Sequence, residues 1–158
     1  MMPSVVGWPI TGSRIGQPKK DGIIENLVAS LGLSAVVHFT GRIANEEFAD
    51  YYAHSTMAIV PSLYEGFGIP AAEAMACGVP LVSTSGGALP EVVGDAGIIV
   101  PPAAAKALAR AIEHLLDAPE ERKKYAQAGL ARVHSVFSWK KAARESADVY
   151  REAIRDYH

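Results

Sequence analysis

Two glutamates, Glu65 and Glu73, are separated by seven residues in the glycine-rich stretch EGFGIPAAE. Gly66 and Gly68 lack a Cβ atom, so a ligand can approach the backbone amides of this turn closely. Pro70 suits the first turn of a helix, whose unpaired N–H groups and positive dipole end attract phosphate or sugar oxygens. Carboxylates beside such amides would accept hydrogen bonds from the hydroxyls of a polyol. The stretch is therefore a candidate ligand site.

Each glutamate also has a simpler structural explanation. Glu73 falls near the third residue of the expected helix, where a carboxylate can reach back and cap the helix N-terminus. Glu65 lies on the loop, where a solvated acid needs no ligand to explain it. On spacing alone, capping and ligand binding are balanced for Glu73, and both interpretations stay open for Glu65.

The segments around this turn alternate as in a parallel sheet covered by helices. Short apolar runs, typical of strands buried on both faces, alternate with longer segments of helical period. We expect strands at Ser4–Gly7, Val36–Phe39, Met57–Val60, Pro80–Ser83 and Gly97–Val100. We expect helices at about Asp21–Leu31, Asn45–Ala53, Pro70–Ala76, Leu89–Val93, Ala103–Leu116, Pro119–His134 and Trp139–Asp156. The predicted fold class is α/β, a Rossmann-like doubly wound parallel sheet, whose ligands bind beyond the carboxyl ends of the strands.

Length and composition narrow the class of protein. The chain has 158 residues and a formal net charge of −2, so we expect one domain, residues 1–158, without the basic surface that nucleic acid requires. It has one cysteine, Cys77, which excludes an internal disulfide, and its N-terminus does not resemble a signal peptide. We therefore predict a cytoplasmic protein that does not bind nucleic acid.

The other motifs in the sequence do not indicate a P-loop, a metal site or a nucleophilic cysteine. The glycines at 7 and 12 have the spacing of a P-loop, but Ser13 stands where the phosphate-binding lysine belongs. The five histidines have no paired metal-ligand spacing, and Asp-x-Asp does not occur, so we predict no metal site. Cys77 is interpreted as a small core residue rather than a nucleophile.

The stretch PSLYEGFGIPAAEAMACGVPLVSTSGGALPEVVGDAGIIVPP resembles the core of the retaining nucleotide-sugar glycosyltransferases with the GT-B fold. The pattern of that family is E-G-F-G-[LI]-P-x-x-E-A-M-A-x-G-x-P, and the chain carries it intact from Glu65 to Pro80. The flanking segments LGLSAVVHFTGRI and FSWKKAARESADVYREAI are also similar to segments of the family. The resemblance covers nearly the whole chain, and it implies the C-terminal, donor-binding half of a GT-B enzyme.

The resemblance also implies roles for individual residues. The first glutamate of the motif, Glu65, would contact hydroxyls of the donor sugar as the catalytic residue of this half, and the second, Glu73, would contact the ribose. The amides of one run would hold the sugar and the diphosphate: Gly66, Phe67, Gly68 and Ile69. Arg42 and Ile43 would lie by the nucleobase, although Arg42 is also explained as a surface arginine in a loop. The implied substrate is a nucleotide diphosphate sugar such as a UDP- or GDP-sugar, with no cofactor and no metal ion.

Two features of the family are not found in this sequence. Relatives carry an Arg and a Lys that neutralise the donor diphosphate before the segment matching Ser4–Pro9, and before that an acceptor-binding N-terminal domain. Arg14, Lys19 and Lys20 follow that segment, so none is given this role. We therefore expect the acceptor domain to be absent and the chain to be nearly inactive in isolation.

The closing helix, at about 139–156, is predicted to be amphipathic. In relatives this helix crosses back to the acceptor domain, so its apolar stripe is expected to mediate self-association here. The resemblance also leaves room for peripheral membrane contact in a full enzyme. Two alternatives remain at this stage: a nucleotide-sugar epimerase of the same architecture, and a non-catalytic module that binds a nucleotide sugar.

Overall fold

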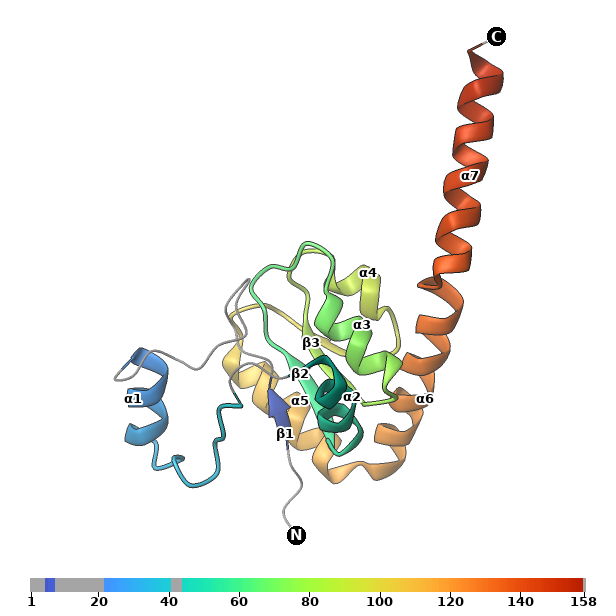
Figure 1. The fold of residues 1–158 in the computed structure, drawn as a ribbon. Helices are drawn as coiled ribbons and strands as arrows, with labels where there is room; N and C mark the ends of the chain where they lie inside the picture. The colour runs from blue at the N-terminus through green and yellow to red at the C-terminus, as the bar shows by residue number, and fades with distance from the viewer. Residues whose placement is uncertain (1–4, 8–21, 41–43, 158) are drawn as a thin grey trace.

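The centre of the molecule is a parallel sheet (Figure 1). The computed structural model describes residues 5–7, 22–40 and 44–157. Within them, four strands lie in the order β1-β2-β3-β4, and all three pairings are parallel. The strands are β1 (Val5–Gly7), β2 (Met57–Val60), β3 (Leu81–Thr84) and β4 (Ile98–Val100). The carboxyl ends of these strands therefore meet at one edge of the sheet.

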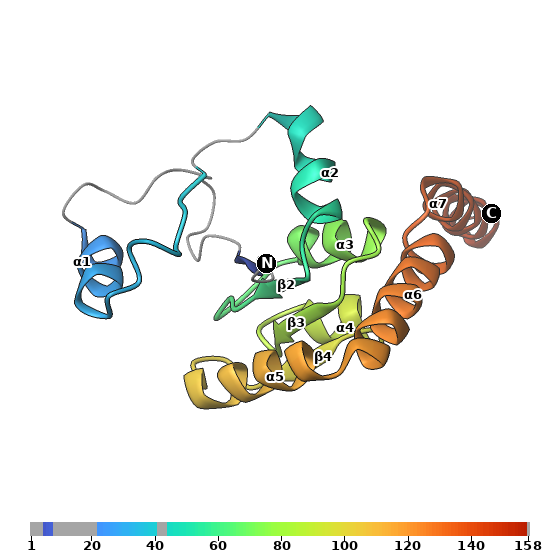
Figure 2. The same ribbon diagram turned by 90° about the horizontal axis from the view of Figure 1, so that it is seen from below.

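Helices cover both faces of this sheet. In chain order the helices of the described residues are α1 (Ile23–Ser30), α2 (Asn45–Ala53), α3 (Ile69–Ala76), α4 (Leu89–Val93), α5 (Ala105–Asp117), α6 (Pro119–Val136) and α7 (Trp139–Asp156), of which α1 and α7 extend away from the sheet. Figure 2 shows α2 and α3 on one side of the sheet and α5 on the other. Helix α6 runs beside them and contributes residues to the clusters on both faces. The predicted doubly wound α/β architecture is confirmed.

The alternation of side chains along the strands explains the two layers. Ala58, Val60 and Leu81 pack in the cluster on the α3 face, whereas Met57 and Val82 pack in the cluster on the α5 face. Near-continuous apolar strands are typical of a parallel sheet whose two faces are both covered by helices.

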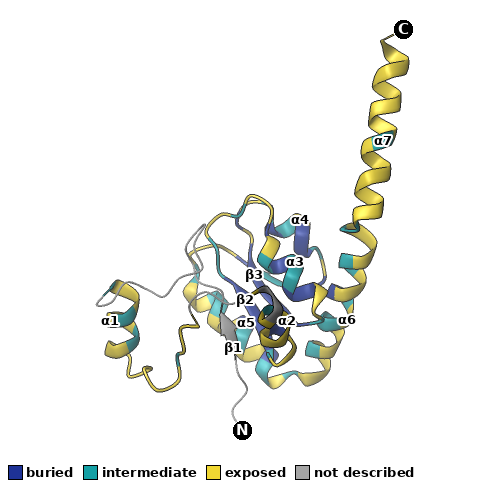
Figure 3. Cartoon of the chain, in the orientation of Figure 1, coloured by how far each residue is buried: buried dark blue, intermediate teal, exposed yellow. Residues whose placement is uncertain are grey.

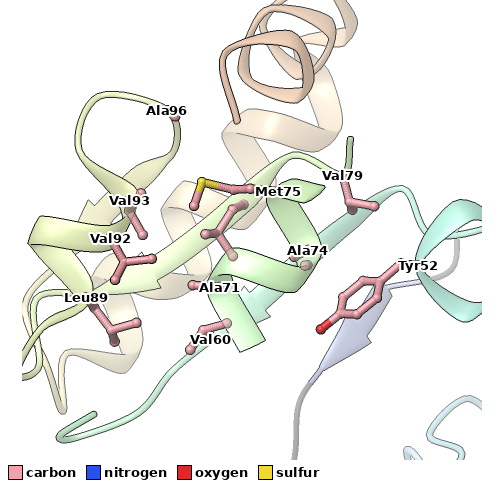
Figure 4. Close-up of a cluster of buried hydrophobic side chains, with 12 residues drawn as sticks. Tyr52, Val60, Ala71, Ala74, Met75, Val79, Leu89, Val92, Val93 and Ala96 are labelled. Atoms are coloured by element: carbon pink, nitrogen blue, oxygen red, sulfur yellow. The ribbon is translucent and has the colours of Figure 1, made fainter. Parts of the chain in front are cut away.

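The cluster on the α3 face binds α3 and α4 together. Figure 4 shows Ala71 and Met75 of α3 close to side chains of α4, whereas Ala74 lies toward Tyr52 of α2. Helix α6 approaches α3 closely at Gly129, where an added Cβ would lie 3.0 Å from Cγ of Met75. The buried residues gather around β2, β3, α3 and α4, which supports the loops at the carboxyl edge (Figure 3).

Most predicted elements are confirmed, and one strand is not. The bounds of α2, α4 and α7 are as predicted, and Gly32 and Gly78 have positive φ angles of 69° and 67° after their helices. The predicted strand Val36–Phe39 is wrong. The amides of Val36 and Val37 both bond to the Leu33 carbonyl at 3.0 Å, so the backbone there forms a local turn instead of a ladder. The sheet of the described residues accordingly has four strands and not five.

Helix α7 leaves the body of the molecule and exposes its apolar face (Figures 1 and 3). None of its residues is buried, and its large exposed apolar side chains are Trp139, Val149, Tyr150 and Ile154. The amphipathic pattern predicted from the sequence is confirmed, and its apolar stripe is left without a partner in the described part of the chain. Among the helices described, none has both the length and the apolar character needed to cross a membrane.

Candidate functional site

The turn between β2 and α3 opens the N-terminus of α3 at the carboxyl edge of the sheet. Gly68 is the N-cap of α3 with φ 92° and ψ 40°, and an added Cβ would lie 2.9 Å from Cδ2 of Leu89. Both the backbone conformation and the lack of space therefore require glycine at this position. Within the described residues, the amides of Phe67, Gly68 and Ile69 donate no recorded hydrogen bond, as expected for the start of a helix. These amides are available to an anionic or hydroxylated ligand.

A second glycine loop, between β3 and α4, packs against the backbone of the turn between β2 and α3. An added Cβ at Gly86 would lie 2.5 Å from the Leu63 carbonyl oxygen, and one at Gly87 would lie 2.9 Å from the Glu65 nitrogen. The Ala88 amide donates to the Glu65 carbonyl oxygen at 2.9 Å. No role was predicted for these two glycines, although a Gly-Gly pair between a strand and a helix is itself a sign of close backbone approach.

A chain of hydrogen bonds connects the two loops to the Glu65 carboxylate. The Thr84 side chain is 3 % exposed, and its hydroxyl donates to the Ser62 carbonyl oxygen. The same hydroxyl accepts from the Gly86 amide at 3.4 Å. The Ser62 hydroxyl donates to Oε1 of Glu65 at 2.8 Å. Glu65 is therefore held in place and partly buried, so the interpretation of Glu65 as a freely solvated loop acid is wrong.

Glu73 has a different environment, and the capping interpretation is wrong. Helix α3 begins at Ile69, so Glu73 is its fifth residue, and the first turn contains no acidic residue. No side chain caps the N-terminus of α3, and within the described residues the Glu73 carboxylate makes no hydrogen bond or ion pair. Partial burial raises the pKa of Glu73 above its ordinary value of 4.5. The carboxylate therefore has no hydrogen-bonding partner among the described residues and is available to a ligand.

Tyr52 of α2 lines the same side of α3. Its side chain is 3 % exposed, and its hydroxyl donates to the Pro70 carbonyl oxygen at 3.3 Å. Burial, and secondarily the charges of Glu73 and Cys77, raise the pKa of Tyr52 above its ordinary value. Tyr52 therefore remains a neutral donor that fastens the first turn of α3 to α2.

Cys77 is not the core residue that the sequence analysis predicted. It is exposed at the C-cap of α3, because the helix ends there and Gly78 turns the chain away. Partial burial of the thiol, together with the charge of Glu73, raises the pKa of Cys77. A raised pKa keeps the sulfur in its weakly nucleophilic thiol form, so the geometry gives no support to covalent chemistry at Cys77.

The remaining predicted site residues lie outside the turn. Arg42 and Ile43, expected by the nucleobase, fall outside the described residues. In the part of the chain that is described, no three or more His, Cys, Asp or Glu side chains are grouped as metal ligands would be. The structure thus brings Glu65, Gly66, Phe67, Gly68 and Ile69 together at one edge, with Glu73 on the next turn of the helix.

An open parallel sheet with a glycine turn and a helix N-terminus at its carboxyl edge is the architecture of the doubly wound α/β domains, in which ligands bind beyond the carboxyl ends of the strands. Residues 6–132 match the model of the family glycosyl transferases group 1, and the chain belongs to this family. Its structural neighbours are GT-B glycosyltransferases, so the fold is that of the GT-B class.

Particular relatives agree with this family. The chain is 43 % identical over 137 residues to an MMP alpha-(1->4)-mannosyltransferase of Mycolicibacterium hassiacum. The matched region covers 85 % of this chain and 33 % of the relative. It is similar to sucrose-phosphate synthase of Thermosynechococcus elongatus, with a TM-score of 0.77, 36 % identity, and coverage of 89 % of this chain and 37 % of that one.

A third likeness concerns the fold alone. Anabaena HepE, solved in complex with UDP, has a TM-score of 0.76 and 23 % identity, with coverage of 82 % of this chain and 36 % of that one. The chain spans about a third of the length of the curated relatives that it matches.

Proposed function

We propose that this chain is the donor-binding domain of a retaining glycosyltransferase that uses a nucleotide diphosphate sugar, such as a UDP- or GDP-sugar. The observation that carries the proposal is the N-terminus of α3, where the amides of Phe67, Gly68 and Ile69 donate to no group of the described residues and lie beside the Glu65 carboxylate, which Ser62 orients. The family membership and the intact E-x7-E motif support the same donor class.

The proposed chemistry is positioning and electrostatic stabilisation. Amides at a helix N-terminus would stabilise the diphosphate as negative charge develops on the leaving group, without a metal ion. Glu65, oriented by the Ser62 hydroxyl, would accept hydrogen bonds from the donor sugar and fix its orientation toward the acceptor. Gly66 and Gly68 would let the sugar approach the backbone.

Glu73, together with Arg42 and Ile43, would hold the nucleoside. Within the described residues the Glu73 carboxylate makes no hydrogen bond or ion pair, so it is available to accept hydrogen bonds from the ribose hydroxyls. Arg42 and Ile43 would lie by the nucleobase, as the family pattern implies. Two ribose hydroxyls would give this carboxylate hydrogen bonds that it does not receive from the described residues.

The acceptor site is assigned to the part of such enzymes that this chain does not match. The curated relatives are about three times as long as the matched region, and an acceptor-binding domain would account for part of that difference. We also propose a cytoplasmic location and association of the chain through the exposed apolar face of α7. On this proposal, the 158-residue chain binds a donor but turns it over slowly or not at all; robust transferase activity of the purified chain would contradict it.

Calorimetric titration of the purified chain with UDP, GDP and ADP, each with and without its sugar, tests the proposal. We expect one nucleotide to bind with clear preference. Glu73→Ala should weaken nucleotide binding by about tenfold or more, because a hydrogen bond to a charged group contributes about 1.5–3 kcal/mol. Glu65→Ala should instead remove the added affinity of the sugar and leave nucleotide binding nearly intact.

Glu113→Ala is the matched control, since Glu113 is an exposed acid on α5, on the opposite face of the sheet. It should change neither affinity. Failure of all three nucleotides to bind, or equal effects of Glu65→Ala and Glu73→Ala on every ligand, would contradict the proposed roles.

A further inference from the structure

The turn between β2 and α3, which we call the donor turn, has an aromatic contact with a distant part of the chain. Phe67 lies between Gly66 and Gly68, and its ring packs edge-on against the ring of Phe137, with centroids 5.9 Å apart and an interplanar angle of 74°. Edge-to-face pairs at this separation are attractive beyond the area that they bury. Phe67 is still 53 % exposed, so the contact with Phe137 is a large part of what fixes its ring.

Phe137 is the more firmly held partner of the two. It is the C-cap of α6, and its amide donates to the Val133 carbonyl oxygen at 3.0 Å. Its half-buried ring packs against the cluster that joins α3 and α4. Phe67, by contrast, is flanked by two glycines, which restrict the backbone least. The contact therefore constrains the turn more than it constrains α6.

The helix that carries Phe137 is itself fixed to the rest of the site. The Arg132 guanidinium of α6 donates to the carbonyl oxygens of Glu91 and Val92 in α4, at 2.6 and 2.8 Å. Helix α7 starts directly after Phe137, because Ser138 is its N-cap and accepts from the Lys141 amide at 3.2 Å. Phe137 thus contacts the turn between β2 and α3 and lies two residues before the first residue of α7.

We propose that Phe137 is a positioning residue for the donor site: its ring holds the glycine-flanked turn in the conformation that presents the Phe67, Gly68 and Ile69 amides to the ligand. This inference rests on the proposed function. It also connects the site to α7, since a shift of the α6–α7 junction would move Phe137 and release Phe67.

Affinity measurements on variants test the positioning role. Phe137→Leu keeps an apolar side chain but removes the ring, and it should weaken binding of the preferred nucleotide by about three- to tenfold. Phe137→Tyr restores the ring and should bind within about twofold of the unchanged chain. Val133→Ala is the matched control, because Val133 packs against the same cluster one turn earlier and should cost stability without changing affinity.

A double variant separates positioning from general loosening of the core. If Phe137 acts through Phe67, then Phe67→Leu combined with Phe137→Leu should bind no more weakly than Phe67→Leu alone. Losses that multiply would overturn the inference, and so would an affinity of Phe137→Leu equal to that of Val133→Ala.

Cleavage by chymotrypsin in the absence of any ligand gives a second measurement. This protease cuts after large apolar residues, and the turn offers it Tyr64 and Phe67, which are 77 % and 53 % exposed. Phe137→Leu should be cut in the turn several times faster than Val133→Ala, and Phe137→Tyr should not. Equal cutting rates would overturn the inference alone, whereas a chain that binds none of the three nucleotides would overturn the proposed function and the role of Phe137 together.

Discussion

Replacing Thr84 by valine tests whether one hydroxyl holds the two loops of the site together. Valine has nearly the same shape, so the change removes the hydroxyl and leaves the packing of a side chain that is 3 % exposed. The hydroxyl donates to the Ser62 carbonyl oxygen and accepts from the buried Gly86 amide. Both backbone groups would lose this partner in Thr84→Val, and the backbone of Ser62, whose side chain orients Glu65, would be held less firmly.

The expected loss follows from the cost of unsatisfied buried polar groups. Leaving such a group without its partner costs about 1–3 kcal/mol, and the bond from Gly86 is long, so we expect about 2 kcal/mol in the free energy of unfolding. For a chain of this size that loss lowers the melting temperature by about 4–8 °C. The added affinity of the donor sugar should fall as well, because the Glu65 carboxylate would no longer be fixed.

Urea denaturation is the assay, with the midpoint read at an unchanged slope. Thr84→Ser is the matched control, since it keeps the hydroxyl and removes only a methyl group, at a cost of about 1 kcal/mol. A Thr84→Val chain whose unfolding free energy lies within about 0.5 kcal/mol of the unchanged chain would refute the reasoning. So would a Thr84→Ser chain that is destabilised more than Thr84→Val.

Two further predictions concern Glu73 and α7. Burial raises the pKa of Glu73 in the folded chain, so the ionised carboxylate weakens the fold once the pH rises above the unfolded pKa, near 4.3, and through the folded pKa. Glu73→Gln should therefore stabilise the chain near neutral pH and not at about pH 4; urea midpoints at both pH values measure this, and an equal gain at both would contradict it. Self-association through α7 predicts a concentration-dependent mass in light scattering that Tyr150→Glu with Ile154→Glu lowers and Lys140→Glu does not; a clean monomer at all concentrations would contradict it.

Local sequence patterns predicted the parts of the fold that depend on near neighbours. The apolar run Met57–Val60 forms the central strand β2 because its side chains have helices to pack against on both faces. Prolines at positions 70, 90 and 119 stand in the first turns of α3, α4 and α6, where their fixed φ angle fits. The strand predicted at Val36–Phe39 failed because the same residue types also fit a turn, and pairing with a neighbouring strand is a tertiary property.

The position of the candidate site was predicted from the sequence, but the contacts that hold it in place were not. The motif from Glu65 to Glu73 located the turn, and the helix start at Ile69 then decided that Glu73 does not cap the helix. The supporting contacts of Thr84 and Phe137 could not be read from spacing, because they join residues far apart along the chain.

The sequence by itself determined the α/β class, the glycine turn at a helix N-terminus and the two acids beside it, since these follow from side-chain type and short-range spacing. The tertiary structure alone decided what each acid does for the fold. The end of β3 brings Thr84 to Ser62 and thereby fixes Glu65, whereas no neighbouring element in the described part of the chain supplies Glu73 with a recorded partner. Hydrogen bonds between loops depend on which strands lie side by side, and that order is set by packing of the whole sheet.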